Sequence, residues 1–358
     1  MTPLAQLLAA RIRASGPMTL ADYMADCLLH PDHGYYATRD PFGAAGDFTT
    51  APEISQMFGE LVGLCLAQSW LDQGAPTPFL LAEIGPGRGT LMADMLRAVA
   101  SVPGMRDAAQ VHLIEASPTL RARQAATLAG HGPVVWHPTL DTLPPGPLFL
   151  IANEFFDALP IRQFQRRADG WCERQVGLPG GKLGFGLARE TRYAALEDRL
   201  DDTSPGQIVE TCPALSGLAA AIAGRIAAHG GAALVADYGG WRSLGDTFQA
   251  VRAHRPVDPF ATPGEADLTA HVAFAPLAAA FADAGAAATG MTPQGAFLER
   301  LGIGGRAERL ARGLTGAALE THLAAYRRLT HPAEMGDVFK MIACHPAGTP
   351  PPPGLDPC

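Results

Sequence analysis

The stretch Phe79-Leu-Leu-Ala-Glu-Ile-Gly-Pro-Gly-Arg-Gly-Thr-Leu-Met-Ala-Asp-Met-Leu-Arg97 decides the fold of this chain. It begins with an apolar run, Phe79 to Ile84, that has the length of a buried strand. Closely spaced glycines follow, and then a helical pattern places Leu91, Met95 and Ala98 on one face. A strand, a glycine-rich turn and a helix in this order bring backbone N–H groups and a helix N-terminus close to a ligand.

An acidic residue distinguishes this turn from a dinucleotide-binding turn. The order is Glu83-x-Gly85-x-Gly87-x-Gly89, whereas the dinucleotide fingerprint is G-x-G-x-x-G. A carboxylate beside the loop would repel a pyrophosphate, but it would favour the ammonium and sulfonium of S-adenosylmethionine (SAM). We therefore predict a SAM-binding loop formed by Glu83, Gly85, Pro86, Gly87 and Gly89. A nucleotide loop is the second interpretation, and a tight turn without a ligand is the third.

Composition limits the classes of function. The chain has 358 residues, 47% of them hydrophobic, and a net charge of −8, with lysine only at Lys182 and Lys340. We therefore expect no nucleic-acid partner, and no apolar run is long enough to span a membrane. The cysteines are scattered without a C-x-x-C pair, so we predict neither a metal site nor a disulfide framework. Together with the lack of a signal sequence, this pattern favours a cytoplasmic location.

Strands and helices alternate after the glycine-rich turn. Strands are expected at residues 79–84, 111–115, 134–136, 148–152, 232–237 and, after a long helical stretch, 338–344. This pattern predicts an α/β fold: a Rossmann-like SAM methyltransferase sheet with helices on both faces and a reversed last strand. We also expect an N-terminal helical extension, in which Thr19 caps a helix, and an inserted hairpin and helical lid.

The expected organisation has three parts. Residues 1–75 are predicted to form an N-terminal helical and loop region, with one helix over Glu53 to Leu71. Residues 76–345 are predicted to form the methyltransferase core, with insertions at about 161–190 and 292–335. The proline-rich tail, 346–358, is predicted to be disordered.

Polar residues at the ends of the predicted strands are candidates for the cofactor site. Glu115 ends the second strand about 26 residues after the last glycine of the loop, where an acid accepts hydrogen bonds from ribose hydroxyls. A strand-end carboxylate in water is the alternative interpretation of Glu115. Asp141 and Leu143 lie on the turn after the third strand, where an adenine would lie. Asn153 follows the fourth strand and is expected to contact the cofactor.

Several motifs are spread in order over most of the chain. They are Gly46-Asp-Phe-Thr-Thr-Ala-Pro-Glu-Ile-Ser-Gln56 with Phe58-Gly59-Glu60, Glu83 to Gly89, Asn153-Glu-Phe-Phe-Asp-Ala-Leu-Pro160, Asp237-Tyr-Gly239, Asp267-Leu-Thr-Ala-His-Val272 and Met335-Gly-x-x-Phe-Lys340. Together these motifs resemble the MidA family of SAM-dependent methyltransferases, whose mitochondrial members include the complex I assembly factor and protein arginine methyltransferase. The resemblance covers about residues 15–343, and one departure is Ala273, where an acid is expected.

The resemblance implies methyl transfer from SAM to an arginine of a protein partner, a respiratory complex I subunit. A guanidinium is charged near neutral pH, so carboxylates are needed to orient it and to draw charge away from the attacking nitrogen. We therefore predict that Glu154, Asp157 and Asn153 are catalytic. The alternative is that Glu154 and Asp157 are acids at a helix N-terminus that interact with the helix dipole.

A substrate-binding role is predicted for Asp47, Thr49, Thr50, Asp237 and His271. The oligomeric state is left open, with a dimer as one option. Two other functions also stay open. One is a SAM-binding assembly factor that docks a partner without turnover. The other is a nucleotide-dependent oxidoreductase, which the glycine spacing and the reversed last strand disfavour.

Overall fold

The computed structural model of the protein describes residues 1–38 and 50–358, which are divided between two compact units. The larger unit takes its segments from Thr49–Phe156, Ser216–Trp241 and Phe274–Cys358. The smaller unit takes its segments from Met1–Phe48, Asp157–Leu215 and Arg242–Ala273. Each unit therefore combines stretches that are distant in sequence. The limits of the two units differ from the boundaries that we expected near residues 75 and 345.

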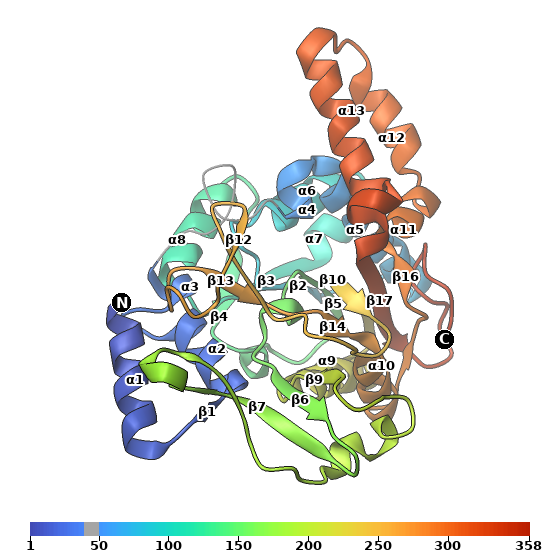
Figure 1. The fold of residues 1–358 in the computed structure, drawn as a ribbon. Helices are drawn as coiled ribbons and strands as arrows, with labels where there is room; N and C mark the ends of the chain where they lie inside the picture. Colours follow the sequence, from blue (N-terminus) through green and yellow to red (C-terminus); the bar gives the residue numbers. More distant parts are fainter. Residues whose placement is uncertain (39–49) are drawn as a thin grey trace. The chain divides into compact units, whose positions relative to one another are not determined.

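A mixed sheet forms the centre of the larger unit. Its strands are β2 (Phe79–Ile84), β3 (Ala109–Ile114), β4 (Val134–His137), β5 (Leu148–Asn153), β10 (Gly231–Gly240), β15 (Ala286–Ala288), β16 (Thr292–Pro293) and β17 (Phe339–Pro346). The spatial order is β15-β17-β10-β5-β2-β3-β4, of which Figure 1 labels the strands from β17 to β4, and the strands from β10 to β4 are parallel. Because β17 runs antiparallel to β10, the predicted reversed last strand is confirmed.

Helices flank this sheet, as the alternating pattern predicted. They are α4 (Ala51–Ile54), α5 (Gln56–Asp72), α6 (Thr90–Val99), α7 (Met105–Ala108), α8 (Pro118–Thr127), α9 (Leu215–His229), α10 (Phe274–Asp283), α11 (Gln294–Arg300), α12 (Ile303–Ala311) and α13 (Gly316–Thr330). On one face, alternate strand residues such as Leu81 and Phe149 pack into one core with Val62 of α5 and Met95 of α6. Full burial of each such side chain stabilises the fold by about 1.5–3 kcal/mol.

Glycines allow α5 and α6 to approach closely. A Cβ atom at Gly59 would lie 2.6 Å from the Cβ of Asp94, and one at Gly63 would lie 2.9 Å from the Cα of Met95. Gly59 and Gly63 are one helical turn apart and therefore lie on the same face of α5. The contact between these helices fixes α6, whose N-terminus follows the glycine-rich turn.

The smaller unit combines the N-terminal helices with antiparallel strands. Its elements are α1 (Pro3–Ser15), β1 (Met18–Thr19), α2 (Leu20–Leu29), α3 (Tyr35–Thr38), β6 (Arg162–Arg166), β7 (Trp171–Gly177), β8 (Gly184–Leu187), β9 (Ile208–Thr211), β11 (Gln249–Arg252), β12 (Arg255–Val257), β13 (Asp267–Thr269) and β14 (Val272–Ala273). β6 and β7 pair as an antiparallel hairpin, as we expected for the insertion. Thr19 caps α2, because its hydroxyl accepts the Asp22 N–H at 3.0 Å.

Two local features differ from the expectations. The helix predicted from Glu53 to Leu71 is interrupted at Ser55, which has extended backbone angles and caps α5 by accepting the Met57 N–H at 3.3 Å. The proline-rich tail, for which we expected disorder, packs onto the larger unit. There Leu355 is buried, and the Asp356 carbonyl accepts the Gly290 N–H at 2.8 Å.

Among the residues that the structure describes, no helix is both long enough and apolar enough to cross a membrane.

We predict that Gly63→Val lowers the free energy of unfolding by about 1–3 kcal/mol, because the added side chain would push α5 away from α6. Gly224 is the matched control, since nothing lies within 4 Å of a Cβ built at this glycine of α9. Gly224→Ala should raise the free energy of unfolding by about 0.5–1 kcal/mol, because alanine favours the helix. Urea denaturation of both variants measures these changes. Equal stability of Gly63→Val and the wild type would contradict the close approach.

Candidate functional site

The glycine-rich turn lies at the carboxyl end of the parallel strands. The Gly85 N–H donates to the Ile114 carbonyl at 3.0 Å, so the turn starts between β2 and β3. Gly85 has a φ of 64°, and a Cβ atom there would lie 2.8 Å from Cδ2 of Phe155. Gly89, with a φ of 82°, is the N-cap of α6. The turn therefore leads directly into a helix N-terminus, which favours negative ligand groups and offers backbone donors.

Glu83 is buried beneath this turn with one carboxylate oxygen unsatisfied. Its side chain is 3% exposed and accepts a hydrogen bond from the backbone of Met92 in α6. Within residues 1–38 and 50–358, the Oε2 atom of Glu83 has no hydrogen-bond partner. Burial raises the pKa of Glu83 to about 8, because a carboxylate loses hydration in the interior. A cationic ligand group would compensate this carboxylate.

A second unsatisfied acceptor lies on the neighbouring strand. Among the described residues, Oδ1 of Asn153 at the end of β5 has no hydrogen-bond partner, although the residue is only 8% exposed. β2 and β5 are parallel neighbours, with Glu83 opposite Ile151. Buried acceptors are normally satisfied, so two orphaned oxygens on adjacent strand ends fit a ligand that brings donors. The ammonium of the SAM amino-acid moiety is such a donor.

Glu115 follows β3 and holds the next part of the turn. Its Oε1 accepts the Ser117 N–H at 2.8 Å, and its Oε2 accepts from Nε2 of Gln124 at 3.1 Å. The same Gln124 amide donates to the Gly87 carbonyl at 2.9 Å. Burial raises the pKa of Glu115, while these donors oppose the rise. Glu115 is thus tied to the glycine-rich turn, and its role as a ribose acceptor stays a prediction.

Gln124 was not recognised from the sequence. It lies one helical turn after Leu120 in α8, and these two are the buried residues of that helix. A polar residue at the buried i+4 position was the available signal. Its carbonyl oxygen accepts from Nε1 of Trp136 at 2.9 Å, and its amide nitrogen donates to the Gly87 carbonyl. Both polar atoms of this side chain therefore have hydrogen-bond partners.

Glu53 is another residue that the sequence did not point to. It lies in α4, within one of the stretches that carry the family resemblance, and its Oε1 accepts from the Thr90 hydroxyl at 2.6 Å. Thr90 is the first residue of α6. This bond fastens the Ala51–Ile54 helix to the end of the glycine-rich turn.

The turn predicted to contact adenine follows β4. Asp141 lies in a short 3-10 helix, Leu140–Thr142, and its side chain is exposed. Leu143 is buried, and its carbonyl accepts from Nη2 of Arg225 at 2.8 Å. This turn follows β4 at the same edge of the sheet as Glu115, because β3 and β4 are parallel.

Glu154 directly follows β5 in a strained backbone conformation. Its φ is 50°, a value that non-glycine residues rarely adopt, at a cost of about 1–3 kcal/mol. Oε1 accepts the Ala51 N–H at 3.1 Å and the Nδ2 group of Asn153 at 3.3 Å. Glu154 therefore binds the N-terminus of α4, which agrees in part with the alternative of a helix-capping acid.

The other predicted residues are distributed between the two units. Asp237 in β10 is fully buried, where Oδ2 accepts the Phe156 N–H at 2.9 Å and Oδ1 accepts the Tyr238 N–H at 3.1 Å. These contacts describe a residue that positions the backbone after β5 and do not support the predicted substrate contact. Asp157 and His271 belong to the smaller unit. Thr50 is the N-cap of α4, whereas Asp47 and Thr49 lie outside the described residues.

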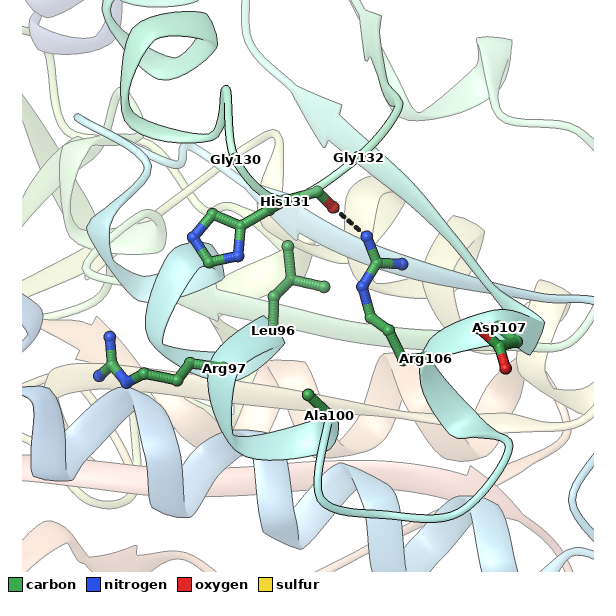
Figure 2. A pocket seen from close by; sticks show the side chains of 8 residues that line it. All are labelled: Leu96, Arg97, Ala100, Arg106, Asp107, Gly130, His131 and Gly132. Atoms are coloured by element: carbon green, nitrogen blue, oxygen red, sulfur yellow. Dashed lines mark hydrogen bonds between the residues drawn. The ribbon is translucent and has the colours of Figure 1, made fainter.

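A shallow cavity of about 550 Å³ lies elsewhere on the larger unit. Figure 2 shows its lining, in which the Arg106 guanidinium donates to the His131 carbonyl beside Leu96 and Arg97 of α6. None of the predicted site residues that the structure describes lines this cavity. The candidate cofactor site therefore lies at the strand ends and not in this cavity.

Comparison with known proteins identifies the family. Residues 61–292 match a family of S-adenosyl-L-methionine-dependent methyltransferases. The chain belongs to this methyltransferase family. It is 36% identical to protein arginine methyltransferase NDUFAF7 of Xenopus tropicalis over 94% of the chain and 84% of that protein. The human protein of the same name is 37% identical over 97% of the chain and 84% of its own length.

A solved structure supports both the fold and the cofactor. A Burkholderia thailandensis protein bound to S-adenosyl-homocysteine is 32% identical, with a TM-score of 0.84, covering 98% of this chain and 93% of that one. The cofactor of this methyltransferase is SAM, and Glu83, Asn153 and the turn from Gly85 to Gly89 would hold it.

The comparisons also correct the expected location. We expected a cytoplasmic protein, but the curated relatives are named as mitochondrial proteins. The cysteine pattern on which we relied cannot distinguish between compartments in which thiols stay reduced, so the cytoplasmic expectation was wrong.

We predict that Glu83→Gln stabilises the ligand-free methyltransferase more at pH 8.5 than at pH 5. In the unfolded chain Glu83 ionises near pH 4.5, whereas the folded protein retains the proton up to about pH 8. Glu83 therefore makes stability fall as the pH rises between these values. Glutamine removes this dependence, while any cost of its buried amide is independent of pH.

Urea denaturation of wild type and Glu83→Gln across this pH range measures the effect. Glu320→Gln, which changes an exposed carboxylate of α13, is the control and should parallel the wild type. A constant difference between Glu83→Gln and wild type at every pH would show that Glu83 titrates normally.

Proposed function

We propose that this methyltransferase transfers a methyl group from SAM to an arginine guanidinium of a protein partner. Relatives that are 36–37% identical over 94–97% of the chain are named protein arginine methyltransferase, which supports an arginine acceptor. The motifs that resemble the MidA family extend the proposal to a respiratory complex I subunit as the partner.

The chemistry sets what the protein must do. SAM supplies a methyl group on a sulfonium, and transfer requires the acceptor nitrogen to lie in line with the carbon–sulfur bond. Most of the acceleration then comes from alignment and from exclusion of water. The protein must also orient a guanidinium, which is charged at neutral pH and carries five donors in a rigid fork. A carboxylate at the edge of the cofactor site meets this need.

The position of Glu154 is the observation that carries the proposal. It follows β5 at the sheet edge where the glycine-rich turn begins, and the neighbouring Asn153 has the orphaned Oδ1. The strained φ of Glu154 is held by the bond from its N–H to the Ala236 carbonyl at 2.8 Å. Strained residues of this kind cluster at functional sites.

The remaining roles follow from the same proposal. Glu154 and Asp157 would orient the guanidinium, and Asn153 would serve the acceptor as well as the cofactor. Asp47, Thr49, Thr50 and His271 would contact the protein substrate. Asp237 would act indirectly, through the backbone of Phe156.

A second candidate is a SAM-binding assembly factor that docks a partner without turnover. The observation that favours it is the engagement of Glu154 with the Ala51 N–H and the Asn153 amide, which gives this carboxylate a structural use.

We predict that Glu154→Gln reduces methyl transfer about a hundredfold, because the variant loses the charge that orients the guanidinium. The amide oxygen of glutamine can still accept the Ala51 N–H, so the fold is expected to persist. The assay incubates the protein with isotopically labelled SAM and a protein extract from cells that lack its gene, and mass spectrometry then detects methylarginine.

Two further measurements interpret the result. Calorimetric titration with S-adenosylhomocysteine should show that Glu154→Gln binds the cofactor product as wild type does, and Glu320→Gln should retain full transfer. Equal transfer by Glu154→Gln and wild type would exclude the catalytic assignment. Cofactor binding by wild type without any methylarginine would favour the docking function.

A further inference from the structure

His137 lies between the two predicted adenosine contacts. It is the last residue of β4, and its carbonyl accepts the N–H of Glu115, the predicted ribose acceptor, at 2.9 Å. The chain after His137 forms the turn that carries Asp141 and Leu143. One residue thus contacts the Glu115 backbone and precedes the turn at which adenine is expected.

A chain of hydrogen bonds leads from β3 through His137 to that turn. The Thr142 hydroxyl donates to the Thr139 carbonyl at 2.8 Å, so it accepts from Nδ1–H of His137 at 3.0 Å. Nε2 of His137 then carries no proton and accepts from Nδ1–H of His112 at 2.8 Å. This pattern requires the His137 imidazole to be neutral, and burial lowers the pKa of both histidines, that of His112 to about 4.

Arg225 holds the same turn from another element. Its Nη2 donates to the Leu143 carbonyl at 2.8 Å, and its Nη1 donates to the Pro144 carbonyl at 3.0 Å. Arg225 lies on α9, whereas His112 and His137 lie on β3 and β4. The turn is therefore fixed at Thr142 from the sheet and at Leu143 and Pro144 from a helix. A turn of a few residues with this many anchors has little freedom to move when a ligand arrives.

We propose that His137, supported by His112 and anchored to the Thr142 hydroxyl, positions the adenosine half of SAM. The chain of hydrogen bonds through His137 sets the position of Asp141 relative to Glu115, so that the carboxylate of Asp141 contacts the exocyclic amine of adenine. This inference rests on the proposed function and deepens it, because it names the residues that select the base of the methyl donor.

The selectivity follows from elementary hydrogen bonding. An exposed carboxylate such as Asp141 only accepts hydrogen bonds, so it favours the amine of adenine and repels the carbonyl oxygen of hypoxanthine. A site built to hydrogen-bond one group discriminates strongly against an analogue that lacks it. This discrimination requires the turn that carries Asp141 to keep a fixed position relative to Glu115, the predicted ribose acceptor. Maintaining that position is the role proposed for His137.

Thr142→Val tests the inference, because valine has the shape of threonine but offers no acceptor to His137. The Thr142 side chain is exposed, so the substitution leaves the core intact. Calorimetry measures the affinities for S-adenosylhomocysteine and S-inosylhomocysteine, which differ at the exocyclic group of the base. We expect Thr142→Val to weaken S-adenosylhomocysteine binding about tenfold and to reduce the preference for it over S-inosylhomocysteine.

Thr142→Ser retains the hydroxyl and should restore both the affinity and the preference. His137→Phe keeps a planar ring without nitrogens and should reproduce the loss, with the unfolding midpoint of each variant measured to confirm folding. Wild-type affinity and wild-type preference in Thr142→Val would overturn the inference while leaving the proposed function intact. Failure of the wild type to bind S-adenosylhomocysteine would overturn the cofactor site and this inference with it.

Discussion

Parallel pairing of β2 with β3 and β5 is the constraint on which the site depends. In this register Glu83 lies opposite Leu113 on one side and Ile151 on the other. All three strands therefore end at one edge of the sheet, where ligands bind in open α/β folds. A shift of one residue would turn Glu83 to the opposite face, away from α6 and its Met92 N–H. The apolar side chains that fix the register thus also fix the position of the buried carboxylate.

Hydrogen-bond partners distinguish an acid that maintains the fold, Asp237, from an acid whose environment favours a cationic ligand, Glu83. Asp237 is fully buried, and both of its oxygens accept backbone N–H groups. Glu83 is buried to a similar extent, but in the described structure its Oε2 has no partner. Burial of an unsatisfied carboxylate is costly, and here the cost takes the form of a raised pKa. SAM would provide the positive charge that this arrangement lacks, which would explain why an acid stands within the otherwise apolar strand β2.

The sequence predicted the parts of this site that depend on local patterns. β2 is apolar except for Glu83 and has the bounds expected for it, and the glycines after it allow a turn that few other residues could adopt. The sequence did not predict the contacts of Gln124, Glu53 and His137. These contacts are hydrogen bonds to other segments of the chain, and neither secondary-structure propensity nor hydrophobic periodicity reports such bonds. The interruption of the helix at Ser55 was not predicted either, because the apolar pattern continues across Ser55 although its backbone angles are extended.

Glu154 shows how a residue can serve both the fold and the chemistry. Its φ of 50° would suit a glycine without strain, so the backbone alone gives no reason for a glutamate. The compensation must come from the carboxylate, and its bond to the Ala51 N–H accounts for part of it. That bond sets the start of α4, whose Glu53 in turn holds Thr90 at the end of the glycine-rich turn. The carboxylate proposed to orient the acceptor is therefore connected, through α4, to the loop proposed to hold the donor, and Glu154→Gln should preserve this connection because its amide oxygen can still accept the Ala51 N–H.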